Sequence, residues 1–503
     1  MANEQLALPL PEITAVPSRV GIPRAQRVFV NRNLRMAGID WVGFDMDYTL
    51  AVYEQAAMDR LSMEVTLQRL LERGYPEYIA QLQVRPEFAI RGLLVDKRLG
   101  HLLKLDRYRV VQKGYHGLRP IPKDELRSIY HTRKTRFAGD RFYWADSLYA
   151  LAETALYASL VDELESKGLQ PDFEKLFTDV RECADGAHRD GTLPGKLLEA
   201  LPRYVRRDLR LAPALHNLRS AGKRLFVLTN SGWTYTNAMM AFLLGDAMPE
   251  YPSWRHYFDF VVVSASKPGF FVERRPFLEL DEGAPPDESP PSRQAHHLER
   301  GRVYEGGNLV DLNRMVNTAA DRVLFVGDHI YGDIVRSKKE AAWRTVLVLQ
   351  ELEAEVAAHE ASSEDFRQLA DLNVRLNQLE DELRANQALY KELTREIEAS
   401  AVADDPPRAA MLEKDRGRVK RAVERIRGLM RTVNHETATL EHEIDTRFHP
   451  YWGSLLKEGT ELSSFGDQVQ AYACVYTSRV SNLLQYSPLQ FFRSPRDLMP
   501  HEL

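Results

Sequence analysis

The fold is decided by the stretch Trp41-Val42-Gly43-Phe44-Asp45-Met46-Asp47-Tyr48-Thr49-Leu50, in which a short apolar run leads directly into two acids. A short continuous apolar run is typical of a strand buried on both faces of a parallel sheet. Because side chains alternate along an extended chain, Asp45 and Asp47 point the same way beyond this strand. One carboxylate could attack an electrophile while the other handles a proton, but an acidic turn is the commoner explanation of such a pair alone.

Further apolar runs of strand length follow along the chain. They lie at residues 225–228, 260–263, 323–326 and 345–349, and helical segments such as residues 214–220 separate several of them. This alternation predicts βαβ units, and hence an α/β fold with a doubly wound parallel sheet. Ligands of such sheets bind beyond the carboxyl ends of the strands.

Two insertions interrupt this core, which we assign to residues 25–50 and 210–350. Residues 51–209 are too many for a simple crossover and are largely helical in pattern, as in residues 144–165, so they predict a mostly helical cap domain. A second insertion, at about residues 273–305, is rich in proline, serine and acids. That composition predicts a flexible surface loop.

Apolar residues recur at heptad-like spacing in two segments after residue 350, with the helix-breaking stretch SAVADDPPR (400–408) between them. This pattern predicts an antiparallel, coiled-coil-like helical hairpin over residues 365–445. A structural arm is one possible role, and a regulatory or partner-binding device is the other. Residues 451–503 are rich in aromatics, and we expect them to pack back on the core.

Composition narrows the class of protein. The 503 residues are 44% hydrophobic and 28% charged, as in a soluble globular protein, and the net charge of -5 gives no reason to expect nucleic-acid binding. The two cysteines, Cys183 and Cys474, are far apart, which argues against a disulfide framework or a cysteine-rich zinc site. With no run of roughly 18 apolar residues and no signal-peptide pattern, we expect a cytoplasmic protein without membrane contact.

Polar groups also follow the second and third predicted strands. Thr229 and Asn230 can offer hydroxyl and backbone N–H groups to a phosphate, although such residues are equally good helix N-caps. Lys267, held by a following proline, could offset negative charge between a nucleophile and a phosphate. An isolated lysine beside a proline is more often a surface charge.

The fourth strand is followed by Asp328 and Asp333, which bracket a turn with glycines. Neighbouring carboxylate oxygens suit Mg²⁺, which takes a few carboxylates together with a substrate phosphate. We expect His329 to be structural, because magnesium prefers oxygen ligands. Along the chain the order is acid pair, hydroxyl, lysine and acid pair, each after a strand, and this order resembles the haloacid-dehalogenase superfamily of phosphatases.

The chain resembles the cytosolic purine 5'-nucleotidase family in four segments: DMDYTL (45–50), TNS (229–231), SKPGFF (266–271) and GDHIYGDIVRSKK (327–339). The resemblance runs from about residue 25 to the Leu-Met-Pro-His-Glu ending and excludes the hairpin. The resemblance implies a Mg²⁺-dependent enzyme that hydrolyses purine nucleoside 5'-monophosphates such as IMP and GMP; the family also includes nucleoside phosphotransferases.

The same resemblance implies a role for each site residue. Asp45 would form an aspartyl-phosphate, and Asp47 would protonate the leaving oxygen and then activate water. Thr229, Asn230 and Lys267 would hold the phosphate. Mg²⁺ would be bound by Asp45, the Asp47 carbonyl and Asp328, with Asp333 in support.

In the cap, Arg181, Asp185 and His188 share one helix face, and the resemblance implies that they contact the nucleotide and that Tyr149 stacks on the base. Without the resemblance, a solvated helix face and a core tyrosine would be preferred. Pro194 stands where members that prefer IMP and GMP carry a lysine. The base preference therefore stays open, and a phosphatase for another phosphomonoester is the alternative. A scaffold with a vestigial site is disfavoured by the intact acids and lysine.

The resemblance also suggests regulation and assembly. Arg136, Tyr331 and Lys339 fall at positions of the family's nucleotide effector site, with Asp146 in place of an asparagine. Activation by an ATP-like effector is thus a hypothesis. Together with the hairpin, the resemblance favours a homo-oligomer, either a dimer or a tetramer.

Overall fold

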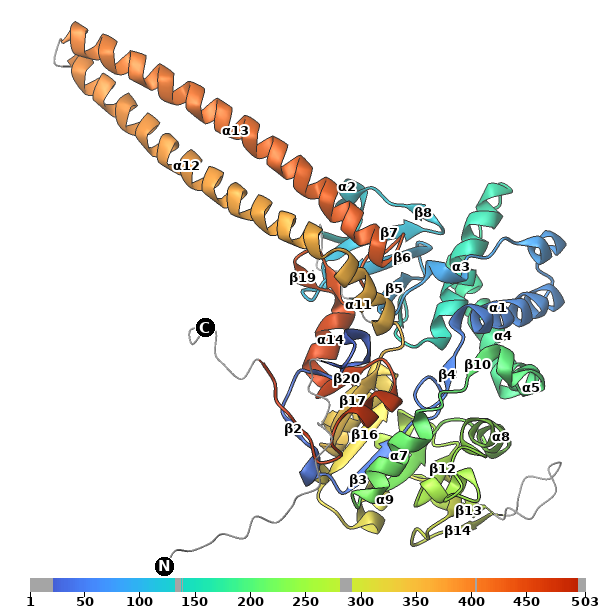
Figure 1. Ribbon diagram of the computed structural model, residues 1–503. Helices are drawn as coiled ribbons and strands as arrows, with labels where there is room; N and C mark the ends of the chain where they lie inside the picture. Colours follow the sequence, from blue (N-terminus) through green and yellow to red (C-terminus); the bar gives the residue numbers. More distant parts are fainter. Residues whose placement is uncertain (1–20, 132–136, 138, 281–291, 403–404, 496–503) are drawn as a thin grey trace, which may run out of the picture. The chain divides into compact units, whose positions relative to one another are not determined.

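The computed structural model describes residues 21–131, 137, 139–280, 292–402 and 405–495 (Figure 1). They divide into two units: residues 354–454 form one, and the rest of the chain on either side of them forms the other. The larger unit mixes helices and strands, so the predicted α/β class is confirmed. None of the helices in the described ranges combines the length and the apolar character that crossing a bilayer requires.

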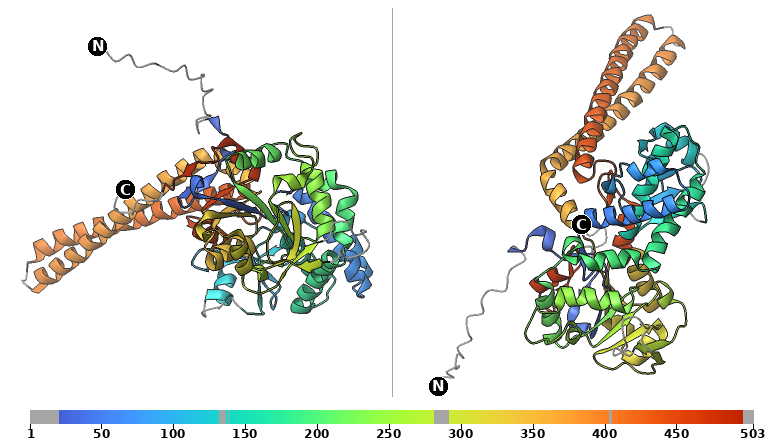
Figure 2. Two further views of the ribbon diagram at one scale, coloured as in Figure 1. Left: turned by 90° about the horizontal axis from the view of Figure 1, so that it is seen from below. Right: turned by 90° about the vertical axis from the view of Figure 1, so that its right-hand side faces the viewer.

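The described part of the larger unit contains a main sheet of ten strands (Figures 1 and 2). From edge to edge they are β1 (Phe29–Val30), β20 (Val475–Thr477), β17 (Arg344–Val348), β16 (Val323–Gly327), β3 (Trp41–Phe44), β11 (Arg224–Leu228), β12 (Phe260–Val263), β15 (Arg302–Gly306), β13 (Phe277–Leu280) and β14 (Ser292–Gln294). The strands from β20 to β15 are parallel to one another, β1 pairs antiparallel with β20, and β13 pairs antiparallel with both β15 and β14. All five predicted strands lie in the parallel part.

The strand order reverses between β3 and β16. From β3 the chain adds β11, β12 and β15 on one side, and later β16, β17 and β20 on the other. Helices α7 (Leu211–Ser220) and α8 (Trp233–Leu244) flank β11 in sequence, and α10 (Arg336–Ala341) joins β16 to β17. A reversal of this kind leaves a crevice at the carboxyl ends of the two central strands, where doubly wound sheets bind ligands.

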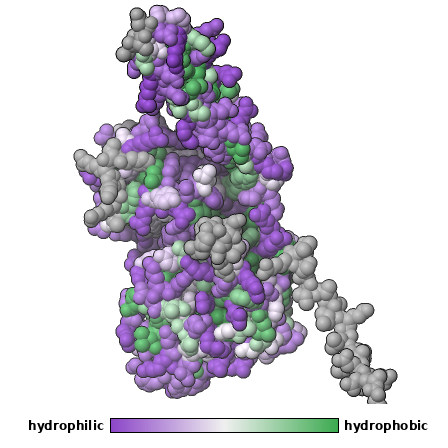
Figure 3. All heavy atoms as spheres, turned by 90° about the vertical axis from the view of Figure 1, so that its left-hand side faces the viewer, coloured by the Kyte–Doolittle hydropathy of each residue, from purple (hydrophilic) through white to green (hydrophobic). Residues whose placement is uncertain are grey.

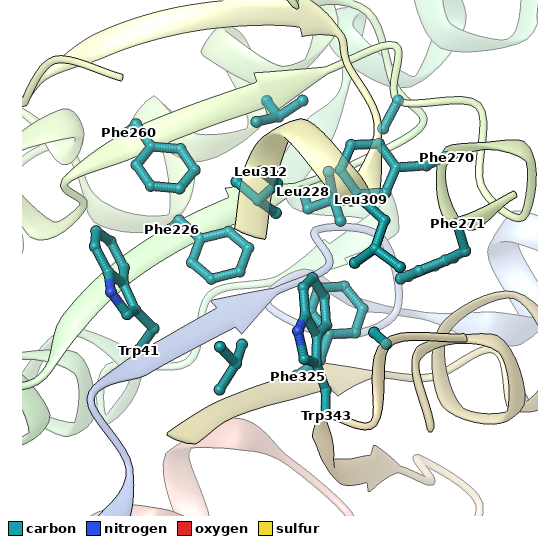
Figure 4. Packing of buried hydrophobic residues seen from close by; sticks show 14 of the residues in the cluster. Trp41, Phe226, Leu228, Phe260, Phe270, Phe271, Leu309, Leu312, Phe325 and Trp343 are labelled. Carbon is teal, nitrogen blue, oxygen red and sulfur yellow. The ribbon is translucent and has the colours of Figure 1, made fainter. Parts of the chain in front are cut away.

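A cluster rich in aromatic residues packs against these central strands (Figure 4). The rings of Phe226 and Phe260 stack with centroids 5.1 Å apart, and the ring of Trp343 lies edge-on to Phe226 at 6.4 Å. Burying one such side chain contributes about 1.5–3 kcal/mol. The packing therefore holds the strands whose ends carry the predicted site residues.

Hydrophilic residues predominate on the face drawn in Figure 3, with hydrophobic residues scattered among them. The exposed large apolar side chains of the described residues include Tyr108, Leu209 and Met411. Single exposed apolar residues are normal on soluble proteins and indicate no binding surface by themselves.

The cap contains the predicted helices together with a sheet that was not predicted. It leaves and rejoins the core at β4 (Val52–Tyr53) and β10 (Val205–Arg206), which pair antiparallel. Its longer helices are α1 (Gln55–Glu72), α3 (Tyr149–Ser166) and α4 (Phe173–Arg189). It also holds an antiparallel sheet in the order β8 (Arg119–Pro120), β7 (Val111–His116), β6 (His101–Leu105), β5 (Leu93–Asp96) and β9 (Phe142–Ala145). The segment predicted to be helical from residue 144 thus begins in a strand.

The sheet escaped prediction because β5 and β6 are buried along their whole length and show no alternation. Lys104 is nevertheless buried in β6, where its Nζ lies 2.7 Å from Glu458 Oε2. A partner more than 350 residues away leaves no local signal in the sequence.

The insertion at residues 273–305 was also predicted incorrectly at its flanks. Residues 281–291 lie outside the described part, but the segments on either side form β13, β14 and β15 of the main sheet. The reason is apolar burial, because Phe277 and Tyr304 belong to the aromatic cluster.

In the smaller unit, the heptad-patterned segments form α12 (Ser363–Val402) and α13 (Pro406–Phe448). Asp405 caps α13 by accepting a hydrogen bond from the backbone N–H of Arg408, and the two prolines occupy its first turn, where they cost no helical hydrogen bond. Leu379, Ile426 and Val433 form the buried seam between the helices.

The C-terminal segment packs on the core as predicted. Its strand β20 joins the main sheet between β1 and β17, and β21 (Phe491–Phe492) pairs with β2 (Leu34–Arg35). The final residues, 496–503, lie outside the described part.

A buried acid on α1 gives a prediction for stability. Asp59 is 4% exposed, and burial raises its pKa to about 7, although Gln55 donates a hydrogen bond to it. Between pH ~4 and ~7 the folded state keeps a proton that the unfolded state has released, so stability falls by about 1.4 kcal/mol per pH unit. Above pH ~7 the whole penalty is present.

Asp59→Asn removes this titration while keeping the oxygen that accepts from Gln55. We therefore expect the variant to gain stability over wild type at pH 8, and to gain far less at pH 5. Thermal unfolding at both pH values measures the difference. Asp124→Asn, at a fully exposed acid, is the control and should shift neither midpoint. An equal gain at both pH values would contradict the raised pKa.

Candidate active site

The predicted site residues come together at the carboxyl ends of β3, β11, β12 and β16. Asp45 continues β3, and its backbone N–H donates to the Val326 carbonyl of β16 at 2.9 Å. Thr229 continues β11, and its N–H donates to Val262 of β12 at 3.0 Å. These cross-strand bonds keep the strand ends level, so the side chains that follow them share one space.

That space is a cavity of about 170 Å³. It is lined by Asp45, Asp47, Ser147, Tyr149, Thr229, Asn230, Lys267, Pro268, Asp328, His329, Gly332 and Asp333. Every predicted catalytic and metal-binding side chain is in this set, together with two of the five predicted substrate contacts. The lining is strongly polar and contains four carboxylates and one amine.

Lys267 is the central cation of the cavity. Its Nζ lies 3.0 Å from Asp45 Oδ1 and 2.7 Å from Asp333 Oδ1. These two carboxylates hold the pKa of Lys267 above its usual value even though burial lowers it. The lysine is therefore charged at neutral pH and can attract an anionic group to Asp45.

Asn230 fixes the lysine from the neighbouring strand end. Its Nδ2 donates to the Lys267 carbonyl at 2.9 Å, and its Oδ1 accepts from the Lys267 N–H at 2.5 Å. Both ends of the side-chain amide are thus engaged. What Asn230 can offer to a ligand in this arrangement is its backbone N–H.

Asp45 is held by two donors on the same oxygen. Its Oδ1 accepts from the Met46 N–H at 2.8 Å and faces Lys267. Within the described residues Oδ2 takes part in neither contact and is the oxygen available for attack. Burial raises the pKa of Asp45 to about 7, Lys267 partly offsets this, and the charges of Asp333 and Asp47 add to it.

Asp47 is held by two hydroxyl groups. Tyr53 donates to its Oδ1 at 2.5 Å and Ser231 donates to its Oδ2 at 2.6 Å. The Tyr53 oxygen also lies 2.8 Å from the Tyr235 hydroxyl. Burial raises the pKa of Asp47, while the two hydroxyls favour its ionised form. A carboxyl in this setting can give a proton and later take one back.

The acids also form a candidate metal site. One carboxylate oxygen each from Asp45, Asp328 and Asp333 lie within 4.8 Å of one another. Burial and the other two carboxylates raise the pKa of Asp328 well above its usual value. A cation stabilises such a cluster in its ionised form, and an all-oxygen donor set fits Mg²⁺.

Gly327 is required by the packing of this cluster. A Cβ at Gly327 would come within 2.5 Å of Asp333 Oδ2 and within 2.6 Å of its Cβ. Asp333 is anchored there by the His329 N–H, which donates to Oδ2 at 3.2 Å. His329 itself accepts from the Gly332 N–H through Nδ1 at 2.8 Å, a contact that fixes the turn.

The predicted base-binding residues are spread over the cap. Tyr149 begins α3 and lines the cavity, and the ring of His188 on α4 lies edge-on to it at 5.2 Å. Arg181 and Asp185, whose charged groups lie 3.7 Å apart, are on α4 outside the set of described residues that line the cavity. Burial lowers the pKa of His188, which leaves a neutral ring beside Tyr149.

Three residues at the predicted effector positions are described. Tyr331 is partly exposed and its hydroxyl accepts from Arg336. Lys339 lies over the ring of Tyr472 at 5.1 Å, and Asp146 lies 3.7 Å from His329 Nε2. Arg136 is outside the described residues.

Several functional neighbours were missed by sequence reasoning. Tyr53 and Tyr235 support Asp47 from a cap strand and from α8, and no spacing rule connects them to it. Glu153, one turn after Tyr149, is buried 3.8 Å from Arg181, and burial raises its pKa to about 7. The i, i+4 spacing from Tyr149 was the only available signal for Glu153.

Comparison with known proteins identifies the family of the chain. The model of the 5' nucleotidase family matches residues 28–503. A 5'-nucleotidase domain-containing protein of Dictyostelium discoideum is 31% identical over 484 residues, which cover 95% of this chain and 75% of that protein.

Two mammalian proteins are also similar. The 5'-nucleotidase domain-containing protein 2 of rat is 33% identical and that of human 32% identical, each over 343 residues and 65% of this chain. The matched region spans 60% of the rat protein and 64% of the human one, less than two thirds of either.

Proposed function

The chain belongs to the 5' nucleotidase family, and from this membership we propose that it is a Mg²⁺-dependent phosphatase of the haloacid-dehalogenase type that hydrolyses purine nucleoside 5'-monophosphates. The observation that carries the proposal is the convergence of Asp45, Asp47 and Lys267 with the Asp328–Asp333 pair around one cavity. A nucleophile, a proton carrier, a cation and a metal site are the parts that phosphoryl transfer to a carboxylate requires.

In the first step Asp45 Oδ2 attacks phosphorus. A bond forms between this oxygen and phosphorus while the bond from phosphorus to the 5' oxygen breaks. Asp47 gives its proton to the departing oxygen, which leaves as the nucleoside hydroxyl. The raised pKa of Asp47 supports this role, because the carboxyl must carry a proton at the start.

In the second step water attacks the phosphorus of the aspartyl-phosphate. Asp47, now ionised, takes a proton from the water, and the bond between phosphorus and Asp45 breaks to release inorganic phosphate. Tyr53 and Ser231 stabilise the ionised form of Asp47 by donating to both of its oxygens. General acid–base help of this kind is worth roughly 10²–10⁴-fold in rate.

The phosphate needs compensation of its negative charge before a carboxylate can approach it. Lys267 supplies one positive charge 3.0 Å from Asp45, and the backbone N–H groups around Thr229 and Asn230 can donate to phosphate oxygens. Asp45, Asp328 and the Asp47 carbonyl would hold Mg²⁺, with Asp333 in support. When bound, the ion neutralises charge on the phosphoryl group.

For the nucleoside, the support comes from the cap. Tyr149 offers an aromatic face at the cavity, and His188 packs against its edge. Arg181 and Asp185 carry a donor and an acceptor that suit the edge of an oxopurine. Phosphoryl transfer to a nucleoside is an extension of the same chemistry, with a nucleoside hydroxyl in place of water.

A second candidate is a phosphatase of the same mechanism with another phosphomonoester as substrate. It is favoured by Pro194 on α5 (Thr192–Glu199), where IMP- and GMP-preferring relatives would carry a lysine, and by the exposure of the nearby Lys196. A panel of nucleoside 5'-monophosphates and sugar phosphates, assayed for phosphate release with Mg²⁺, decides between the two.

We expect IMP and GMP to give the highest kcat/KM in that panel, and EDTA to abolish release until Mg²⁺ is restored. A sugar phosphate that outperforms every nucleotide would replace the first candidate with the second. Release that survives EDTA would contradict the metal site. The nucleotide effector and the homo-oligomer remain predictions, and the same assay with added ATP tests the effector.

A further inference from the structure

Arg91 is an internal cation that the mechanism above does not use. It lies in the cap, two residues before β5, and its side chain is 0% exposed. An isolated buried arginine is costly, because its guanidinium cannot lose its proton under ordinary conditions. Its position therefore has to be explained by its partners.

The partners of Arg91 belong to the core. Its Nη1 donates to the backbone carbonyl of Asp328 at 2.8 Å, and the same nitrogen lies 4.0 Å from Asp328 Oδ2. Its Nε and Nη2 donate to the two carboxylate oxygens of Glu351 at 2.7 and 2.5 Å. Glu351 alone would neutralise the charge, so the contact with Asp328 is a separate feature of the site.

The backbone next to Arg91 leaves room for its side chain beside Phe465. Gly92, the next residue, has φ +81°, a conformation that other residues rarely adopt, and a Cβ there would come within 2.5 Å of Phe465 Cβ. The guanidinium lies over the ring of Phe465 at 5.2 Å. The Arg91 guanidinium is thus held by its ion pair with Glu351 and by the ring of Phe465. Its Nη1 then donates to the carbonyl of Asp328.

The segment after β17 connects this contact to the other acidic loop. Gln350 donates through Nε2 to the Tyr48 carbonyl at 3.1 Å, one residue beyond Asp47. Glu351, the next residue, holds Arg91. Two consecutive side chains therefore hold the loop of the acid pair and, through Arg91, the loop of Asp328.

We propose that Arg91 is a positioning residue of the metal site: it fixes the backbone of Asp328 from the cap, so that the Asp328 carboxylate is held ready to bind a divalent cation. This inference rests on the metal site of the proposed function. Groups that orient metal ligands commonly change metal affinity or activity by about 10–100-fold when they are removed.

The test is direct binding of Mn²⁺, a divalent probe that needs no substrate, followed by loss of the free-ion electron paramagnetic resonance signal. Arg91→Lys keeps the positive charge but cannot reach both partners with a planar fork, and Arg91→Met keeps only the apolar stem. We expect both to weaken Mn²⁺ binding by about tenfold or more. Asp328→Asn identifies the fraction of binding that belongs to this site.

The matched control is Arg107→Met. Arg107 is a partly exposed cap arginine that pairs with Asp467 at 3.1 Å and lies outside the cavity lining of the described residues. We expect its Mn²⁺ affinity to equal that of wild type. Thermal unfolding of each variant separates lost stability from lost affinity, because a purely structural arginine would lower the melting temperature without changing the affinity.

Wild-type or tighter Mn²⁺ binding in either Arg91→Met or Arg91→Lys would overturn the proposal. If neither Arg91 variant folds, Glu351→Gln loosens the fork with both side chains still in place, and unchanged affinity there would overturn the proposal. Failure of the proposed function would give a different result from failure of this proposal. In that case nucleotides would not be hydrolysed, although Mn²⁺ would still bind at the site that depends on Asp328.

Discussion

Asp45→Asn is expected to lower kcat for phosphate release by at least about 10⁴-fold, which is the scale of losses when a catalytic nucleophile is removed. An amide cannot form the acyl phosphate, although it fills the same space and can still accept from the Met46 N–H. Lys267 keeps its second partner, Asp333 at 2.7 Å, so no buried cation is left unpaired. We therefore expect the variant to fold.

Steady-state phosphate release from the best substrate of the panel measures this loss. Asp59→Asn is a matched control, because it also replaces a buried aspartate whose pKa is raised to about 7, but at a position outside the cavity lining of the described residues. The control should change stability and leave kcat near that of wild type. Activity of Asp45→Asn within tenfold of wild type would remove Asp45 as the nucleophile.

The second large effect is expected for Asp47→Asn, with a loss of about 10²–10⁴-fold in kcat for a nucleotide. The amide cannot carry a proton to the 5' oxygen in the first step or take one from water in the second. Tyr53 and Ser231 both donate to the present carboxylate, so the amide NH₂ would also face a donor.

An aryl phosphate separates the two roles of Asp47. Its leaving group departs as an anion and needs no proton, so the first step should survive in Asp47→Asn while the second remains slow. We expect a burst of aryl alcohol equal to the enzyme concentration, followed by slow turnover. Equal losses for the aryl phosphate and the nucleotide, without a burst, would contradict the assignment of both proton transfers to Asp47.

The core of the site could be predicted because its signals are local. Asp45 and Asp328 directly follow buried strands, Lys267 comes four residues after another, and parallel strands bring their carboxyl ends to one edge. Asp45, Lys267 and Asp328 therefore meet in the structure, as their positions after strands predicted. The sequence pattern does not predict the register between neighbouring strands. That register comes from hydrogen bonds such as the one from the Asp45 N–H to the Val326 carbonyl.

What was missed depends on contacts between distant parts of the chain. The cap sheet contains a buried lysine, Lys104, and its partner Glu458 lies in the C-terminal segment. Arg91 could not be predicted from the sequence, because a single arginine before an apolar strand usually indicates a surface charge. Only its contacts with Asp328 and Glu351 distinguish it. Such pairings arise from the folded topology and leave no periodic pattern.

The hydrogen bonds to Asp47 were also missed, because they depend on the folded topology. Ser231 was within a segment recognised for its hydroxyl groups, but that segment was expected to face the phosphate, whereas its Oγ donates to Asp47. Tyr53 lies in β4, where the chain leaves the core for the cap. The pairing of β4 with β10 brings a cap residue to Asp47, and a one-dimensional pattern does not predict that pairing.

The central claim is that Asp45 carries the phosphoryl group during turnover, and trapping that group tests it most directly. Enzyme turning over its best substrate with Mg²⁺ is quenched in acid and reduced with borohydride, which converts an aspartyl-phosphate to homoserine. Peptide mass spectrometry then locates the change. We predict homoserine at position 45, absent without substrate and absent in Asp45→Asn. Homoserine at another aspartate, or none while wild-type enzyme is demonstrably turning over, would contradict the claim.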